Sequence, residues 1–175
     1  MRGDDFLSVG NDKNSGRRLS IDILDHFINK KMETLYTIIN AIALLGWLSL
    51  IFLPKKKWTF TIVVSGGVSA ILALFYIYFI VGSITGEATG GDFSSLKGLK
   101  ALFQSDIALL AGWAHYLVFD LFIGAWMTSN AQRLGLAHWK IIPCLLFTFM
   151  MGPVGLLLYF IVRANLTKKI LHDNF

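Results

Sequence analysis

Four long apolar runs follow one another along the chain, separated by shorter polar stretches. They cover residues 34–53, 58–82, 106–127 and 138–162. A helix of about 20 predominantly apolar residues is needed to cross the hydrocarbon core of a bilayer. The pattern therefore predicts an all-α membrane protein. Because short links make neighbouring helices antiparallel, we expect a four-transmembrane-helix up-down bundle with short interfacial helices.

The polar stretches add two predicted interfacial helices. Residues 1–31 form a polar extension, which we expect to be disordered up to about Leu19 and then helical over 20–31, before a transmembrane domain at 32–175. Between the second and third runs, apolar residues from Phe93 to Phe103 recur at helical spacing. This second amphipathic helix is either a membrane anchor or a lid over the bundle.

Composition excludes several classes of protein. The chain is 55% hydrophobic and 15% charged, with a net charge of +5, and its mean hydropathy is +0.61. Most Lys and Arg flank the apolar runs, where they anchor helices at lipid headgroups, so nucleic acid is not an expected partner. Counting these cations favours cytoplasmic termini, although Lys55, Lys56 and Lys57 then lie on the opposite side. The lone Cys144 and the scattered histidines predict no metal or other cofactor.

The third run carries the chain's sharpest candidate chemistry, in His115 and Asp120. An aspartate near the bilayer centre costs about 2.5–3.5 kcal/mol on insertion scales, so it needs a partner or a function. Helical spacing places Trp113, Tyr116 and Asp120 on one face. His115 lies about 140° away from Asp120 around the helix axis, so the two side chains diverge around Phe119.

The fourth run contains a predicted helix break at Gly152-Pro153. Proline lacks a backbone donor and leaves the Phe149 carbonyl without its helical partner. In an antiparallel fourth helix this carbonyl lies near His115, which we expect to donate to it, with Thr148 close by. The candidate site therefore lies between the third and fourth helices.

Structural explanations stand beside the functional one. Buried polar side chains also hold membrane helices together, at roughly 0.6 kcal/mol for each interhelical hydrogen bond. His115 is open to either interpretation on these grounds. Arg163 either pairs with Asp106 at one membrane face or binds a lipid headgroup or the polar end of a ligand.

The order of residues from Phe103 onward resembles the abscisic-acid-deficient-four-like family. The resemblance rests on Phe103-Gln104-Ser105, Gly112-Trp113-x-His115-Tyr116-x-x-Phe119-Asp120-Leu121-Phe122-x-Gly124, Pro143-Cys144-Leu145-Leu146 and Gly152-Pro153-x-Gly155. Plant members are plastid membrane proteins associated with neoxanthin synthesis. Because no transit peptide is evident, we expect a bacterial member in the inner membrane.

The resemblance implies a carotenoid or xanthophyll ligand and an isomerisation without net redox change. Opening an epoxide needs an acid, and removing a proton from the polyene needs a base. These roles would fall to Asp120 and His115 respectively. Trp113, Tyr116, Phe119, Thr148 and Arg163 would bind the ligand. The alternative is a non-catalytic carotenoid- or lipid-binding accessory subunit, alone, as a homo-oligomer or in a membrane complex.

Overall fold

The computed structural model describes residues 5–85 and 91–167, and within them it is helical without strands. The chain divides into two units, Met1–Thr37 and Ile38–Phe175. Helix α1 (Asp5–Phe52) contributes to both. It is continuous where the sequence predicts a disordered stretch and a separate interfacial helix. Extending an existing helix fixes one residue for each added hydrogen bond, so a polar segment joins it more readily than it nucleates its own helix.

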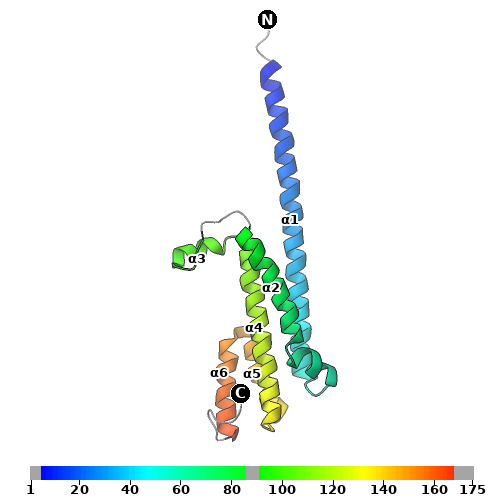
Figure 1. Cartoon of the computed structure of the whole chain (residues 1–175), viewed down its shortest axis with the longest axis vertical. Helices are drawn as coiled ribbons and strands as arrows, with labels where there is room; N and C mark the ends of the chain where they lie inside the picture. The colour runs from blue at the N-terminus through cyan, green and yellow to red at the C-terminus, as the bar shows by residue number, and fades with distance from the viewer. Residues whose placement is uncertain (1–4, 86–90, 168–175) are drawn as a thin grey trace. The chain divides into compact units, whose positions relative to one another are not determined.

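The remaining elements all belong to the second unit. They are η1 (Thr59–Val64), a π-helix; α2 (Gly67–Thr85); α3 (Leu96–Leu102); α4 (Asp106–Arg133); η2 (His138–Lys140), a 3-10 helix; α5 (Ile142–Met151); and α6 (Pro153–Thr167). Figure 1 shows α2 beside α4, and α5 beside α6. Helix α3 confirms a short helix inside the predicted 93–103 stretch.

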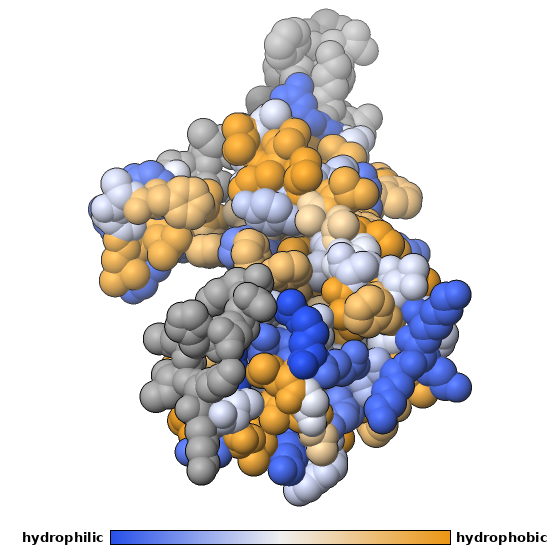
Figure 2. All heavy atoms as spheres, turned by 60° about the horizontal axis from the view of Figure 1, so that its bottom comes forward, coloured by the Kyte–Doolittle hydropathy of each residue, from blue (hydrophilic) through white to orange (hydrophobic). Residues whose placement is uncertain are grey.

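Three helices are long and apolar enough to cross a membrane, namely Gly16–Phe52, Gly67–Thr85 and Asp106–Arg133. Their lateral surface is rich in exposed large apolar side chains, such as Leu74 and Phe119, and Figure 2 shows orange hydrophobic side chains over much of one view. These features are those of a helical membrane protein. The first and third predicted spans are confirmed as apolar helices, and the second is interrupted between η1 and α2.

Contacts along α4 fix the direction of its neighbours in the second unit. Gly46 packs against Leu121, and Trp47 against Gly124, so this part of α1 runs parallel to α4. Gly82 of α2 packs against Ile107 near the start of α4, so α2 runs antiparallel to it. The alternation of α1, α2 and α4 therefore agrees with the up-down arrangement predicted for the first three runs.

The predicted fourth span is not one helix but a hairpin of two shorter ones. Gly152 separates α5 from α6 with φ +41° and ψ −94°, a conformation that favours glycine. Gly155 then packs directly on the backbone of α5 at Thr148 and Cys144, which a side chain would prevent. At about 1.5 Å per residue, α5 rises only about 15 Å, half the thickness of a hydrocarbon core.

The tip of this hairpin lies at the middle of α4, and both of its ends lie near the end of α4. Gly152 contacts Asp120, whereas Tyr159 of α6 bonds Asn130. Helix α6 therefore runs parallel to α4, where a single fourth span would have run antiparallel. Backbone at membrane depth that departs from a helix is tolerated when it is buried in protein.

Candidate functional site

Helix α4 carries both chemistry-bearing residues of the predicted site. Its sequence is rich in Leu and Ala and lacks proline, and Ser105 precedes it in an extended conformation. Small residues such as Ala108, Ala111 and Ala114 are buried and let neighbouring helices approach closely. His115 and Asp120 lie on the central turns of this helix, within its membrane-crossing stretch.

Asp120 faces the tip of the α5–α6 hairpin. A Cβ atom built on Gly152 would lie 2.8 Å from Asp120 Oδ1 and 3.1 Å from Oδ2, so the carboxyl group lies directly against the glycine. Asp120 Oδ2 is buried and has no hydrogen-bond partner. The Tyr116 side chain is near enough to interact with this carboxyl group, as their shared helix face predicts. A buried polar atom without a partner is unusual in a folded protein, and a functional role is one explanation for it.

The Phe149 carbonyl, which the break at Gly152-Pro153 leaves without a helical partner, accepts a hydrogen bond from a residue other than the predicted His115. Tyr116 donates its hydroxyl to Phe149 O at 3.1 Å. The expected free carbonyl is confirmed, but His115 as its donor is wrong because the hairpin brings Phe149 to the Tyr116 face of α4. The Trp113 ring stacks on Tyr116 at 5.3 Å between centroids, and Trp113 Nε1 donates to Asn40 Oδ1 at 3.2 Å.

His115 faces α2 instead of the hairpin. Its ring centroid lies 5.6 Å from that of Tyr76 and 4.6 Å from that of Phe119. Phe119 is 54% exposed and borders His115 on the outer surface of α4. His115 and Asp120 therefore diverge, as the sequence predicts, but Asp120 rather than His115 points to the Pro153 break.

His115 lines a cavity of about 700 Å³ between α2, the segment before α3, and the first half of α4. Its walls are mostly apolar and aromatic, and they comprise Tyr76, Ile80, Ser83, Ile84, Gly91, Asp92, Phe93, Leu102, Phe103, Ala108, Ala111, Gly112 and His115. Gly112 packs against the Phe103 ring, so a side chain there would displace this wall. The size and lining are those of a small-molecule site.

Asp92 supplies the carboxylate among the cavity's lining residues, although its place in a Gly-rich turn did not predict a role there. Its Oδ1 accepts from the Ser94 amide at 2.8 Å and from the Ser94 hydroxyl at 2.7 Å. These bonds hold the pKa of the Asp92 carboxyl below its usual value, so it is ionised near neutral pH. The Ser95 hydroxyl caps α3 by accepting from Gly98 N at 3.0 Å. The Asp-x-Ser-Ser sequence before an apolar helix was the available signal for this capped turn.

Two other predicted ligand-binding residues are buried within the protein. Thr148 is fully buried, and its hydroxyl donates to Cys144 O at 2.8 Å. Arg163 is only 6% exposed, and its Nε has no hydrogen-bond partner. The predicted Asp106–Arg163 pair is wrong, because α6 runs parallel to α4 and carries Arg163 towards the end of α4 opposite Asp106. There Tyr159 donates to Asn130 Oδ1 at 2.6 Å, and Arg163 is close enough to interact with Tyr159.

Three apolar helices, with an aromatic cavity beside a histidine of the third, define a class: helical membrane proteins with a cavity between their helices. The comparisons with known proteins are more specific. The chain belongs to the ABA DEFICIENT 4-like family, whose sequence profile matches residues 34–159. It is similar to "Protein ABA DEFICIENT 4, chloroplastic" of Arabidopsis thaliana, with 29% identity over 124 residues.

That alignment covers 66% of this chain and 54% of the Arabidopsis protein, so the chain spans about half the length of the curated relative. The family match confirms the resemblance carried by the third and fourth apolar runs. It begins at Thr34, after the polar extension, and includes the α2–α4 cavity and the hairpin tip. No solved structure matches the chain.

Proposed function

We propose that this protein binds a carotenoid-type ligand in the bilayer and places one end group of that ligand in the α2–α4 cavity. The observation that carries the proposal is His115, a histidine inside a membrane-crossing helix, lining an aromatic cavity of about 700 Å³. Membership of the ABA DEFICIENT 4-like family supports a carotenoid-related ligand. The proposed location is a membrane, the inner membrane if the source is bacterial.

The chemistry proposed for this ligand is an acid–base isomerisation. An acid transfers a proton to an epoxide oxygen as its C–O bond breaks. A base then removes a proton from the polyene as the allene forms, so the product has the same atoms and oxidation level. His115 is the proposed base, since it faces the cavity with Tyr76 beside it. Asp120 is the proposed acid, since its buried Oδ2 has no partner.

Phe119 retains its proposed role as a ligand contact, because it borders His115 and is half exposed on the surface of α4. Trp113 and Tyr116 are proposed to support Asp120 through their stacked rings. Thr148 is proposed to shape the hairpin whose tip lies against Asp120. Arg163 is proposed to hold the polar end of a ligand or a headgroup at the end of α4.

One observation favours a second function, binding without turnover. His115 faces α2, whereas Asp120 faces Gly152 of the hairpin. Two groups that point to different neighbours do not meet at one small reacting centre, whereas the isomerisation needs its acid and its base at the same end group. An accessory subunit that binds a carotenoid or a lipid, in a homo-oligomer or a membrane complex, uses the same cavity. It does not need His115 and Asp120 to act together.

Purification of the full chain from a carotenoid-producing host separates these functions. We expect visible absorbance in the preparation, and about a tenfold loss of pigment in H115Q but not in H26Q, a control at an exposed histidine of the first unit. Conversion of added epoxy-carotenoid to a new species, abolished in D120N, supports the isomerase. Pigment recovered unchanged supports the accessory subunit. A colourless protein that takes up no carotenoid overturns both.

A further inference from the structure

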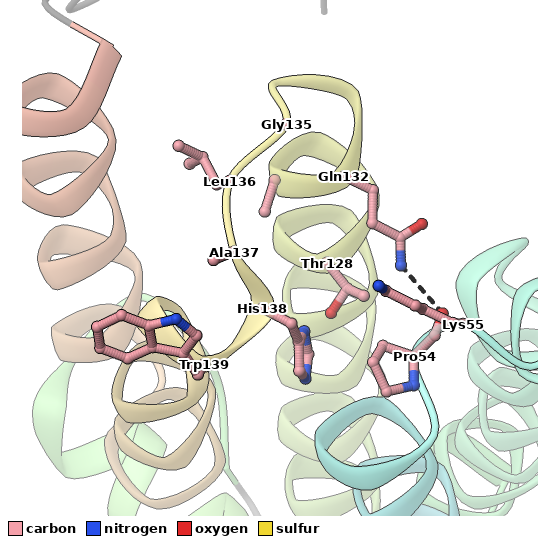
Figure 3. A pocket seen from close by; sticks show the side chains of 10 residues that line it. Pro54, Lys55, Thr128, Gln132, Gly135, Leu136, Ala137, His138 and Trp139 are labelled. Carbon is pink, nitrogen blue, oxygen red and sulfur yellow. Dashed lines mark hydrogen bonds between the residues drawn. The ribbon is translucent and has the colours of Figure 1, made fainter.

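A second cavity, of about 640 Å³, lies at the opposite end of α4 from the His115 cavity. It is bordered by the link after α1, the last turns of α4 and the segment that leads into η2 (Figure 3). Its lining residues are Pro54, Lys55, Thr128, Ala131, Gln132, Gly135, Leu136, Ala137, His138 and Trp139. Neither the family match nor the proposed ligand assigns this cavity a role.

Two hydrogen bonds hold its walls together. Gln132 Nε2 donates to Pro54 O at 3.0 Å, the dashed line in Figure 3. His138 Nε2 lies 2.9 Å from Ile51 O. These side chains tie the end of α1 to α4 and to η2.

The charges around this cavity are positive. Lys55 lines it, and Figure 3 shows Lys55, Thr128 and His138 grouped around the same space. The described carboxylates of the second unit lie elsewhere: Asp92 and Asp106 at the other end of α4, and Asp120 at its middle. Within the described residues Lys55 therefore has no acidic partner at this end.

Four further cations lie close to lining residues in the sequence, and they are Lys56, Lys57, Arg133 and Lys140. Figure 2 shows hydrophilic side chains on the face turned forward, next to the hydrophobic flank. A cluster of cations without counter-charges attracts anions.

The position of the cavity identifies the kind of anion. Trp139 is 70% exposed, and Lys140 Nζ lies 5.7 Å from its ring centroid. Tryptophan beside lysine at the end of an apolar helix is typical of the membrane–water interface. Basic pockets between helices at that level bind the headgroups of anionic lipids. Pro54, Ala131 and Leu136 supply apolar wall for the glycerol part of such a lipid.

We propose that this cavity binds the phosphate headgroup of an anionic phospholipid, with Lys55 as the direct cation. The ammonium group pairs with the phosphate, the Lys140–Trp139 pair borders the headgroup, and the acyl chains leave along the apolar flank. The site is independent of the carotenoid proposal, because it shares no lining residue with the His115 cavity.

The test uses the purified full chain in nanodiscs and native mass spectrometry. The discs contain phosphatidylcholine with roughly 10–20% phosphatidylglycerol, so that the anionic lipid is in several-fold excess over the protein. In these discs we expect one retained phosphatidylglycerol per chain and a higher Tm than in phosphatidylcholine alone. K55Q should weaken retention about tenfold. K57Q removes the same charge outside the cavity and should leave retention unchanged.

Three outcomes would overturn the proposal. Equal losses in K55Q and K57Q would show attraction by a diffuse basic face. Displacement of the retained lipid by millimolar inorganic phosphate would assign the cavity to a free phosphate. Equal retention of phosphatidylcholine would show that the anionic headgroup is not recognised. Since Lys55 is exposed, K55Q should fold normally, and an unchanged Tm without phosphatidylglycerol verifies this.

Discussion

The Asp120 carboxyl group lies against Gly152, so that the middle of α4 meets the point where α5 and α6 reverse direction. Any Cβ atom at position 152 would come within 2.8 Å of Asp120 Oδ1. The contact joins the Asp120 carboxyl group to the tip of the hairpin, so we expect a change at either residue to affect the other.

Replacing Gly152 with alanine should therefore cost more than replacing a glycine in open space. Gly152 and Gly135 both have positive φ, at +41° and +68°, but a Cβ at Gly135 meets nothing within 4 Å. We expect G135A to lose about 1 kcal/mol of stability from backbone strain, and G152A to lose at least about 2 kcal/mol. Thermal unfolding in detergent measures both. If the contact is responsible, D120S should recover part of the loss in G152A but none in G135A.

Removing the Tyr116 hydroxyl should loosen the hairpin. Y116F deletes the bond to Phe149 O, which is worth about 0.6 kcal/mol by the average for membrane helices. Y76F also removes a phenolic hydroxyl, but one in the α2–α4 cavity, and should leave stability nearly unchanged. Hydrogen exchange of the 145–155 peptide provides the local measurement. Faster exchange in Y76F than in Y116F would contradict this assignment.

The hairpin predicts which positions face the same side of the membrane. With Cys144 replaced by alanine, single cysteines at Lys140 and Leu166 should react with an impermeant maleimide from one side. A cysteine at Lys97, before α4, should react from the other side. A continuous fourth span would instead place positions 140 and 166 on opposite sides, and that labelling pattern would refute the hairpin.

The Asp92 turn should be insensitive to pH in the physiological range. Its lowered pKa means that any stability from the Ser94 bonds is present above the carboxyl's usual value of 3.8 and is lost only as pH falls through its folded pKa, below 3.8. Carotenoid binding measured from pH 5 to 8 should therefore have the same profile in D92N as in the unaltered chain. A profile that shifts in D92N would show that Asp92 titrates within this range.

Much of the helical architecture could be predicted from the sequence, because length and hydropathy determine which segments suit a bilayer. The divergence of His115 from Asp120 followed from helical geometry alone. The break at Gly152-Pro153 was also evident, but its consequence was not. A 25-residue apolar run fits both a kinked span and a hairpin, and the φ of one glycine decides between them. That reversal reassigned the neighbours of His115 and Arg163.

The cavity wall at Asp92 was harder to predict for a different reason. Its partners Ser94 and Gly98 are small polar or flexible residues, which are typical of any turn. Only the folded position of the 91–103 segment against α2 and α4 gives this turn a cavity to line. In the amphipathic segment, Phe93 and Phe103 line the cavity. This position agrees both with a membrane anchor and with a lid over the bundle.

The shortness of α5 and α6 has a consequence for biogenesis. Neither helix is long enough to be threaded across a bilayer by itself, and each carries backbone at its tip that only the protein can shield. We therefore expect the pair to enter the lipid together, as one hairpin, from the side on which both of its ends remain. The contact between Asp120 and Gly152 would then form only when the whole hairpin has entered.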